Sequence, residues 1–190
     1  MKFDDGSFLR LYRQTVEDFG LYPGCELSQE RMEELRDHAS ATSAKMRAVR
    51  IVSASNVSKR DLEQRLIHKG EDPQKAKEAV AWMSGLNLVD DQQTARQIVE
   101  RCASKGYGPS RAKQMLYEKQ IPRSLWDGAL EDYPDQTDYI VEFLRAKLIP
   151  DDQRQRKKII DTLMRRGHSY SAIRRGLEIV GDEAEEFLED

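Results

Sequence analysis

Apolar residues recur at helical spacing along most of this chain, and one short pattern appears three times, ~50 residues apart. The pattern occupies residues 58–70, 109–120 and 155–167. When their last residues are superimposed, apolar side chains coincide at two positions: Leu62, Ala112 and Ile159, then Leu66, Leu116 and Leu163. A cation precedes each last residue: Lys69, Lys119 and Arg166. The sequence therefore predicts a helical repeat array, which offers an extended surface rather than a deep pocket.

Helix start and stop signals divide the chain from residue 43 onward into short helices. Ser58 and Asp72 are good N-caps, while Gly70 and Gly106 can end helices in the left-handed conformation. Three sets of three helices result, over about 43–86, 90–133 and 136–181. Because each set is too small to bury a sufficient core alone, neighbouring sets should stack. We expect a mainly α fold of three tandem three-helix repeats in an elongated, curved array, with limits at 43–88, 89–134 and 135–190.

The first 42 residues show a different pattern. Asp4-Asp5-Gly6 is a turn signal between the strand-like runs Lys2-Phe3 and Phe8–Tyr12. Further on, Ser28 is a plausible N-cap for a following helix. We therefore expect residues 1–42 to form a small β-hairpin and a helix.

Composition agrees with an array of small units. Of 190 residues, 38% are hydrophobic and 34% are charged, so the chain has few residues for a large core and many for a solvent-exposed surface. The only cysteines, Cys25 and Cys102, lie far apart and are expected to be reduced, packed thiols. No apolar run approaches the ~20 residues of a membrane span, and the first residues are not a signal segment. We expect a soluble, cytoplasmic monomer with no membrane contact.

Charge is distributed unevenly around a net value of −3. Residues 151–175 contain eight Lys and Arg against three Asp, whereas the tail after residue 177 is strongly acidic. A local cationic patch can hold an anionic partner even when the total charge is slightly negative. The strongly basic balance of a dedicated nucleic-acid binder is not present in this composition.

No motif in the sequence indicates catalysis. The three histidines lack metal-ligand spacing, and Gly106–Pro109 lacks the pattern of a phosphate-binding loop. His68 and His168 adjoin helix-ending glycines, where an imidazolium would interact favourably with the helix dipole. No serine, cysteine or lysine stands in a nucleophile setting. We predict no enzyme activity, no metal and no cofactor.

The candidate binding residues are cations that recur in each unit, together with one tyrosine: Arg60, Arg65, Lys69, Tyr107, Arg111, Lys113, Lys119, Arg156, Lys157, Arg165 and Arg166. Each helix taken alone could carry such cations as an ordinary solvated face. Aligned across stacked units, they could meet nucleic-acid phosphates or the acidic surface of a protein filament. Tyr107 could pack between units or stack on a base. The sequence does not choose between these alternatives.

Two segments resemble a known family. Residues 86–91, Ala95 and residues 105–119, which begin Lys105-Gly-Tyr-Gly-Pro109, look like the central signature of the RecX regulatory family. Arg165-Arg-Gly-His-Ser-Tyr170, with Ile173 and Leu177, resembles that family's last repeat. Gln120 departs from the family pattern, which has a glycine there.

This resemblance implies a non-enzymatic, negative modulator of the RecA recombinase. Members of the family are built from tandem three-helix repeats and bind the RecA filament on single-stranded DNA. They usually inhibit strand exchange and ATP hydrolysis, and thereby regulate recombination, DNA repair and the SOS response. One alternative is a module of helix-turn-helix-like units that binds DNA directly, and another is a helical scaffold for a different protein. A RecA-binding protein of this kind could also contact DNA weakly.

Overall fold

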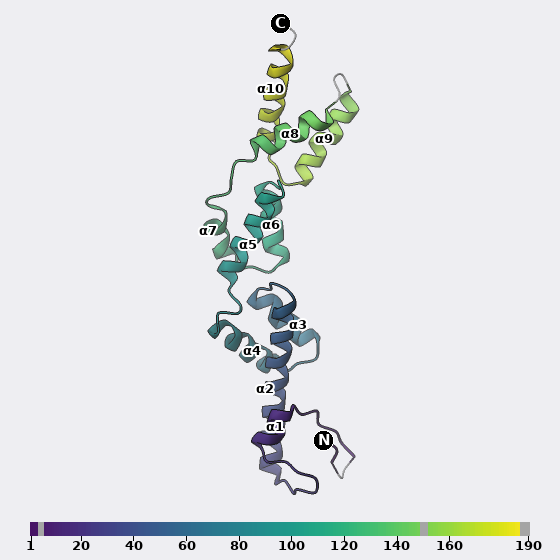
Figure 1. Ribbon diagram of the computed structural model, residues 1–190, viewed down its shortest axis with the longest axis vertical. Helices are drawn as coiled ribbons and strands as arrows, with labels where there is room; N and C mark the ends of the chain where they lie inside the picture. Colours follow the sequence, from purple (N-terminus) through teal and green to yellow (C-terminus); the bar gives the residue numbers. More distant parts are fainter. Residues whose placement is uncertain (4–5, 149–151, 187–190) are drawn as a thin grey trace. The chain divides into compact units, whose positions relative to one another are not determined.

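The computed structural model describes residues 1–3, 6–148 and 152–186, with side chains up to Gly181. The chain divides into two compact units, residues 1–90 and 91–190 (Figure 1). The first unit contains α1 (Arg13–Asp18), α2 (Gln29–Ala54), α3 (Lys59–His68) and α4 (Pro73–Gly85). The second contains α5 (Asp91–Ser104), α6 (Pro109–Glu118), a 3₁₀ turn (Arg123–Leu125), α7 (Trp126–Leu130), α8 (Thr137–Lys147), α9 (Gln153–Arg165) and α10 (Tyr170–Glu186). The fold is mainly helical, as predicted.

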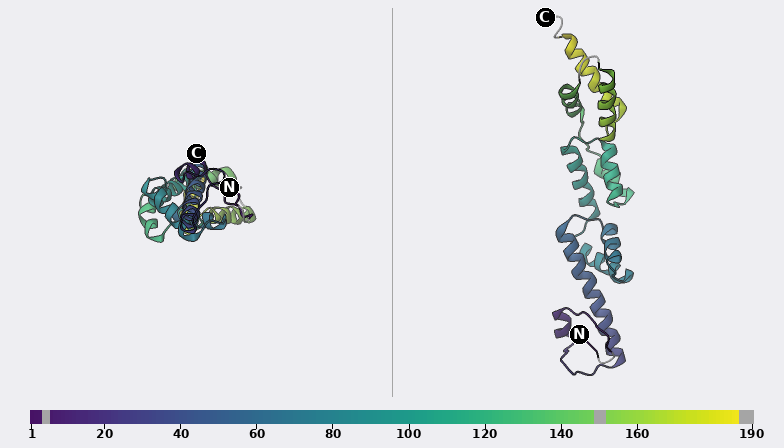
Figure 2. Two further views of the ribbon diagram at one scale, coloured as in Figure 1. Left: turned by 90° about the horizontal axis from the view of Figure 1, so that it is seen from below. Right: turned by 90° about the vertical axis from the view of Figure 1, so that its right-hand side faces the viewer.

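Three separate clusters of buried side chains hold the helices together. In the first unit, α2, α3 and α4 enclose a core around Leu62, Leu66 and Met83. In the second unit, α5, α6 and α7 share one core around Leu116, and α8, α9 and α10 share another around Leu163. Figure 2 shows α5 beside α6 and α8 near α10 within this unit. Three consecutive helices supply each core, which fits the predicted three-helix repeats.

The repeated sequence pattern corresponds to one repeated structure, formed by α3, α6 and α9. All six superimposed apolar residues are buried. Each of the three helices ends in a Schellman motif, in which the residue after the cation has a positive φ: 87° at Gly70, 55° at Gln120 and 91° at Gly167. The N–H of the following residue then donates to the carbonyl oxygen of the buried leucine. These hydrogen bonds run from Glu71 to Leu66 at 3.1 Å, from Ile121 to Leu116 at 3.0 Å and from His168 to Leu163 at 3.2 Å. Gln120 therefore keeps the backbone of the glycine that it replaces.

The predicted N-terminal hairpin is not seen. In the described part of this segment, one isolated antiparallel bridge pairs Lys2 with Phe8, and no strand extends from it. Asp4 and Asp5 of the predicted turn lie outside the described residues. A two-stranded hairpin gains little burial of its own, and Phe8 is 75% exposed. Turn and strand signals were therefore insufficient to make a ladder here.

The predicted domain limits remain predictions, although two structural facts bear on them. Helix α2 runs without a break across the proposed limit at residues 42/43. A partly buried interaction also ties this helix to the residues that follow α3, because Glu71 accepts hydrogen bonds from Arg47 at 2.6 Å and Ser43 at 2.9 Å. The side chains of the acidic tail beyond Gly181 lie outside the described residues.

Candidate partner-binding surface

The predicted binding residues differ in how freely they meet solvent. Six are exposed on α3, α6 and α9: Arg60, Lys69, Lys113, Arg156, Lys157 and Arg165. Two of the others form ion pairs on their own helices. Arg65 binds Asp61 at 2.8 Å, and Arg111 lies 3.8 Å from Glu118. Lys119 is half-buried.

Superposition of the three Schellman motifs shows how far the cations recur. Lys69, Lys119 and Arg166 all occupy the C-cap position of their helices. The other cations have no such equivalence; the position of Arg65, for example, is taken by Met115 and Thr162. A cation at a helix C-terminus interacts favourably with the helix dipole. Helix stability therefore accounts for the one cation that α3, α6 and α9 share, which is the residue at the C-cap.

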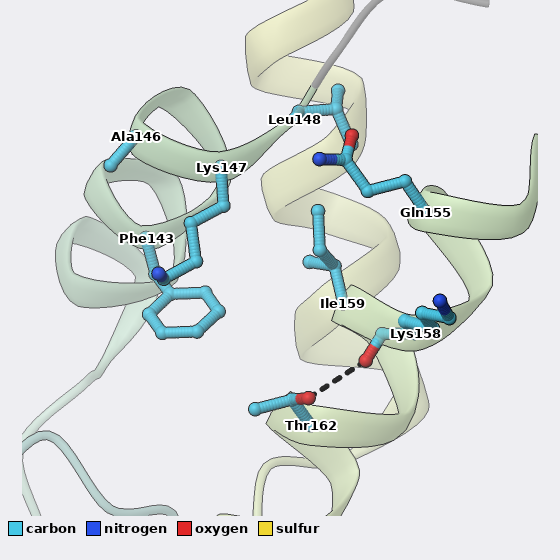
Figure 3. Close-up of a pocket in the computed structure, with 8 residues that line it drawn as sticks. All are labelled: Phe143, Ala146, Lys147, Leu148, Gln155, Lys158, Ile159 and Thr162. Carbon is cyan, nitrogen blue, oxygen red and sulfur yellow. Dashed lines mark hydrogen bonds between the residues drawn. The ribbon is translucent and has the colours of Figure 1, made fainter. Parts of the chain in front are cut away.

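Helix α9 is the most cationic element, and a groove runs along each side of it. The groove toward α8 has a volume of about 570 Å³ and is lined by Phe143, Ala146, Lys147, Leu148, Gln155, Lys158, Ile159 and Thr162 (Figure 3). The groove toward α10, of about 560 Å³, is lined by Gln153, Arg156, Lys157, Ile160, Tyr170, Arg174, Leu177 and Glu178. Helices α8 and α10 pack closely together, whereas α9 contacts each of them less. This looser packing leaves both grooves open.

The two segments that carry the family resemblance meet in the second unit. The start of α6 lies against the end of α9: Gly108 N–H donates to Arg166 O at 2.9 Å, and Ser110 N–H donates to Gly167 O at 3.2 Å. Amides at the N-terminus of one helix thus pair with carbonyls at the C-terminus of another, which satisfies groups that a single helix leaves without partners. We call this contact of residues 105–110 with residues 166–168 the α6–α9 joint.

Two glycines permit the close backbone approach in the joint. A Cβ atom at position 108 would lie 2.1 Å from Gly167 O, and one at position 167 would lie 2.3 Å from Arg111 N. Both neighbours are backbone atoms, which cannot swing aside as a flexible side chain can. The glycines of both signature segments are therefore required by the same contact.

Arg166 and Tyr107, both predicted to bind a partner, contact each other in the joint, and their part in partner binding stays a prediction. The guanidinium of Arg166 lies 4.7 Å from the ring centre of Tyr107 and 5.2 Å from that of Tyr139. It also donates to Lys105 O at 2.7 Å. Two cation–π contacts and this hydrogen bond hold the arginine at the joint.

The buried ring of His168 completes the joint. Its Nε2 lies 3.1 Å from Gly106 O, and because a carbonyl oxygen only accepts, this nitrogen carries the proton. The ring also stacks on Tyr139, with centroids 5.9 Å apart. Burial lowers the pKa of His168, and the positive charge of Arg166 lowers it further, against the opposing effect of the Gly106 hydrogen bond. His168 is buried at its helix end, whereas His68 is exposed at the end of α3, and the interaction of an imidazolium with the helix dipole stays a prediction for both.

Sequence reasoning missed the part that Tyr139 plays. This residue contacts Arg166 and His168 from α8, and its ring fills the space that a side chain at Gly106 would occupy, 2.2 Å from that Cβ position. The available signal was a pair of glycines at positions 106 and 108 around an aromatic residue. That signal indicates a close approach but does not identify the approaching residue.

We searched the described residues for a metal site, a membrane-spanning helix and free thiols. Nowhere in 1–3, 6–148 and 152–181 do three His, Cys, Asp or Glu side chains gather in a way that could hold a metal ion. Among the helices described, none combines the length and apolarity needed to cross a bilayer. Cys25 and Cys102 are free thiols, and Cys102 is buried, where burial raises its pKa.

Comparisons with known proteins agree on one family. The family model for the second three-helix domain of RecX matches residues 90–130. A regulatory protein RecX from Clostridioides difficile is 26% identical over 181 residues, which cover 92% of this chain and 85% of the relative. Another, from Xanthomonas campestris pv. campestris (strain B100), is 30% identical over 132 residues, covering 67% of this chain and 82% of the relative.

A solved structure supports the fold. The crystal structure of a regulatory protein RecX superimposes with a TM-score of 0.67 at 21% sequence identity. The match covers 94% of this chain and 90% of that chain. The likeness therefore extends over both units rather than over one signature segment.

Proposed function

The chain belongs to the RecX family of regulatory proteins, and we propose on that basis that it is a negative modulator of the RecA recombinase. In this proposal it binds the RecA filament on single-stranded DNA and inhibits strand exchange and ATP hydrolysis. Family membership is the observation that carries the proposal. The regulated processes are recombination and DNA repair, including the SOS response, and the protein acts in the cytoplasm without a cofactor.

The arrangement of the second unit supports binding rather than catalysis. The joint fixes α6 against α9 with the cations Lys113, Arg156, Lys157 and Arg165 exposed to solvent. A surface that holds a filament gains from several modest contacts at once, because each contact raises the effective concentration for the next. Exposed charge pairs contribute only about 0.2–1 kcal/mol each, so several must act together.

The first test is the rate of RecA-dependent ATP hydrolysis on single-stranded DNA, titrated with this protein. We expect the rate to fall as the protein approaches the concentration of filament subunits. An unchanged rate at several-fold excess, together with no binding to RecA in sedimentation with DNA and nucleotide, would refute the proposal.

The second test asks whether α9 forms part of the binding surface. Replacing Arg156, Lys157 and Arg165 by Glu should raise the half-inhibitory concentration about tenfold, because three lost charge pairs at about 0.5 kcal/mol each sum to that factor. The control replaces the exposed Lys77, Arg96 and Arg101 by Glu, with the same change in net charge. Equal losses in both variants would show that overall charge, rather than α9, determines the inhibition.

Direct DNA binding remains the alternative, and the exposed Tyr170 beside Arg156 and Lys157 is the observation that favours it. Aromatic stacking combined with cations is how many proteins hold single strands. Tight binding to naked DNA that falls steeply with salt would support this alternative. Binding that requires RecA would support the proposed function.

A further inference from the structure

The groove between α9 and α10 has cations on both of its walls. Arg156 and Lys157 project from α9, and Arg174 projects from α10. Arg174 is bound to Glu178 on its own helix at 2.8 Å, but its side chain is still 72% exposed. Within the described residues, no ion pair forms at Arg156 or Lys157. The groove therefore presents a net positive charge to solvent.

Helix stability does not explain the cations of α9. Arg156 and Lys157 lie in the N-terminal part of this helix, where Asp152 caps the first turn by accepting from Gln155 N–H at 2.9 Å. The dipole favours cations only near the C-terminal end of a helix, so it does not account for Arg156 and Lys157 as it does for Lys69, Lys119 and Arg166.

The floor and rim of the groove are not uniformly polar. Ile160 and Leu177 are half-buried at its base, and Tyr170 is 64% exposed at its edge. Glu178 adds one carboxylate to the α10 wall. The bases of a nucleic acid could stack on Tyr170, but its backbone carries a negative charge at every residue, which the Glu178 carboxylate would repel. A peptide that combines acidic and apolar side chains complements both the charges and the floor.

We propose that the α9–α10 groove docks an acidic, partly apolar segment of a protein partner. Its carboxylates pair with Arg156, Lys157 and Arg174, while an apolar side chain covers Ile160 and Leu177 beside Tyr170. The inference rests on the proposed function, in which the partner is the filament protein, and narrows it to one groove and one kind of segment.

Residues 182–190 of the chain have the composition that the proposal asks of the partner segment, because they contain six acidic residues and the pair Phe187-Leu188. A peptide of this sequence is therefore a suitable probe of the groove.

The test uses the full chain and a fluorescein-labelled peptide with the sequence of residues 182–190, which serves as the acidic, partly apolar probe. Binding is followed by fluorescence anisotropy. The double variant Arg156→Gln/Arg174→Gln should weaken peptide binding about fivefold to tenfold, since two charge pairs are lost. The control Arg154→Gln/Arg175→Gln changes exposed cations on the same two helices that do not line the groove, and should stay within twofold of the unmodified protein.

Three outcomes would overturn the inference. One is equal weakening by both double variants, which would indicate diffuse electrostatics. A second is a nine-nucleotide oligothymidine that loses affinity in the groove variant while the peptide does not. A third is a dimer, detected by sedimentation, that the groove variant dissociates, since the groove would then hold a second copy of this chain.

The experiment also separates the inference from the proposed function. If the peptide fails to bind while RecA inhibition persists, the inference alone is refuted. If the peptide binds through the groove while RecA is neither bound nor inhibited, the proposed function is refuted instead.

Discussion

Gly108 offers a direct test of the α6–α9 joint. The substitution Gly108→Ala places a methyl group 2.1 Å from Gly167 O and 2.5 Å from His168 N, distances that real side chains do not tolerate. The backbone at Gly108 has φ −83° and ψ 166°, which alanine adopts without strain. Backbone strain at position 108 therefore does not contribute to the loss of stability, which arises from the contact with α9 and, in smaller part, from the lower N-cap preference of alanine.

The expected loss of stability follows from the contacts of the joint. Separation of α6 from α9 removes two backbone hydrogen bonds, at about 1 kcal/mol each. It also weakens the contact of Arg166 with Tyr107, by about 0.5–1 kcal/mol. The reduced entropy of the unfolded chain returns about 0.5 kcal/mol. We expect the free energy of unfolding of the second unit to fall by about 2–2.5 kcal/mol.

Urea unfolding can be followed in this unit alone. In a Trp82→Phe background, Trp126 of the second unit is the only indole, and its Nε1 donates to Ile121 O at 3.0 Å in the folded state. The control is Gly128→Ala in α7, where an added Cβ has no neighbour within 4 Å and should stabilise by up to about 1 kcal/mol. Amide exchange at Gly108 N–H measures the joint directly. If Gly108→Ala leaves both the urea midpoint and this protection unchanged, the joint as described is refuted.

Two further substitutions test local features. Because burial lowers the pKa of His168, the unfolded chain takes up a proton there at a higher pH than the folded chain, so stability should fall as the pH drops through the ordinary value of 6.5. His168→Gln should reduce the difference between the urea midpoints measured at pH 7.5 and 5.5. If the difference stays the same, groups other than His168 cause the pH dependence of stability. Gln120→Gly should raise the free energy of unfolding by about 0.5–1 kcal/mol, since φ is 55° at this position. Gln114→Gly, at an exposed position inside the preceding helix, should lower the free energy of unfolding by about 1 kcal/mol. If both glycine variants were more stable, the positive φ at Gln120 would not explain the gain.

The positions that sequence predicted correctly are those fixed by local rules. Leu62 and Leu66 could be placed in a core because helical periodicity and a following glycine define both the face and the end of a helix. Superposition extended this to Leu116, although Gln120 hides the usual stop signal. The N-terminal hairpin depended on tertiary support, which its turn and strand signals do not encode.

The joint itself could not have been predicted from one sequence. Arg166 and Lys105 are 61 positions apart, and neither segment contains a signal that names the other. Both looked locally complete, one as a glycine-rich helix start and the other as a basic helix end. Their likeness to family signatures indicated that they matter without indicating that they form a single contact. For the same reason, the contact between Arg166 and Tyr107 could not be foreseen.

The joint also determines which parts of the second unit can hold an anion. A helix N-terminus is often an anion site because its first amides lack partners. At α6 the amides of Gly108 and Ser110 are already bonded to α9, and at α9 the carboxylate of Asp152 caps the first turn. The start of α6 therefore does not offer these two amides to a partner, and the negative charge of Asp152 disfavours an anion at the start of α9. Anion recognition at these helices falls to the side chains of exposed Lys and Arg. Exposed side-chain charges are screened by salt far more than buried ones. Partner binding should consequently weaken as the salt concentration rises from about 50 to about 300 mM. An affinity that does not change would show that the apolar floor at Ile160 and Leu177, rather than the cations beside it, supplies most of the binding energy.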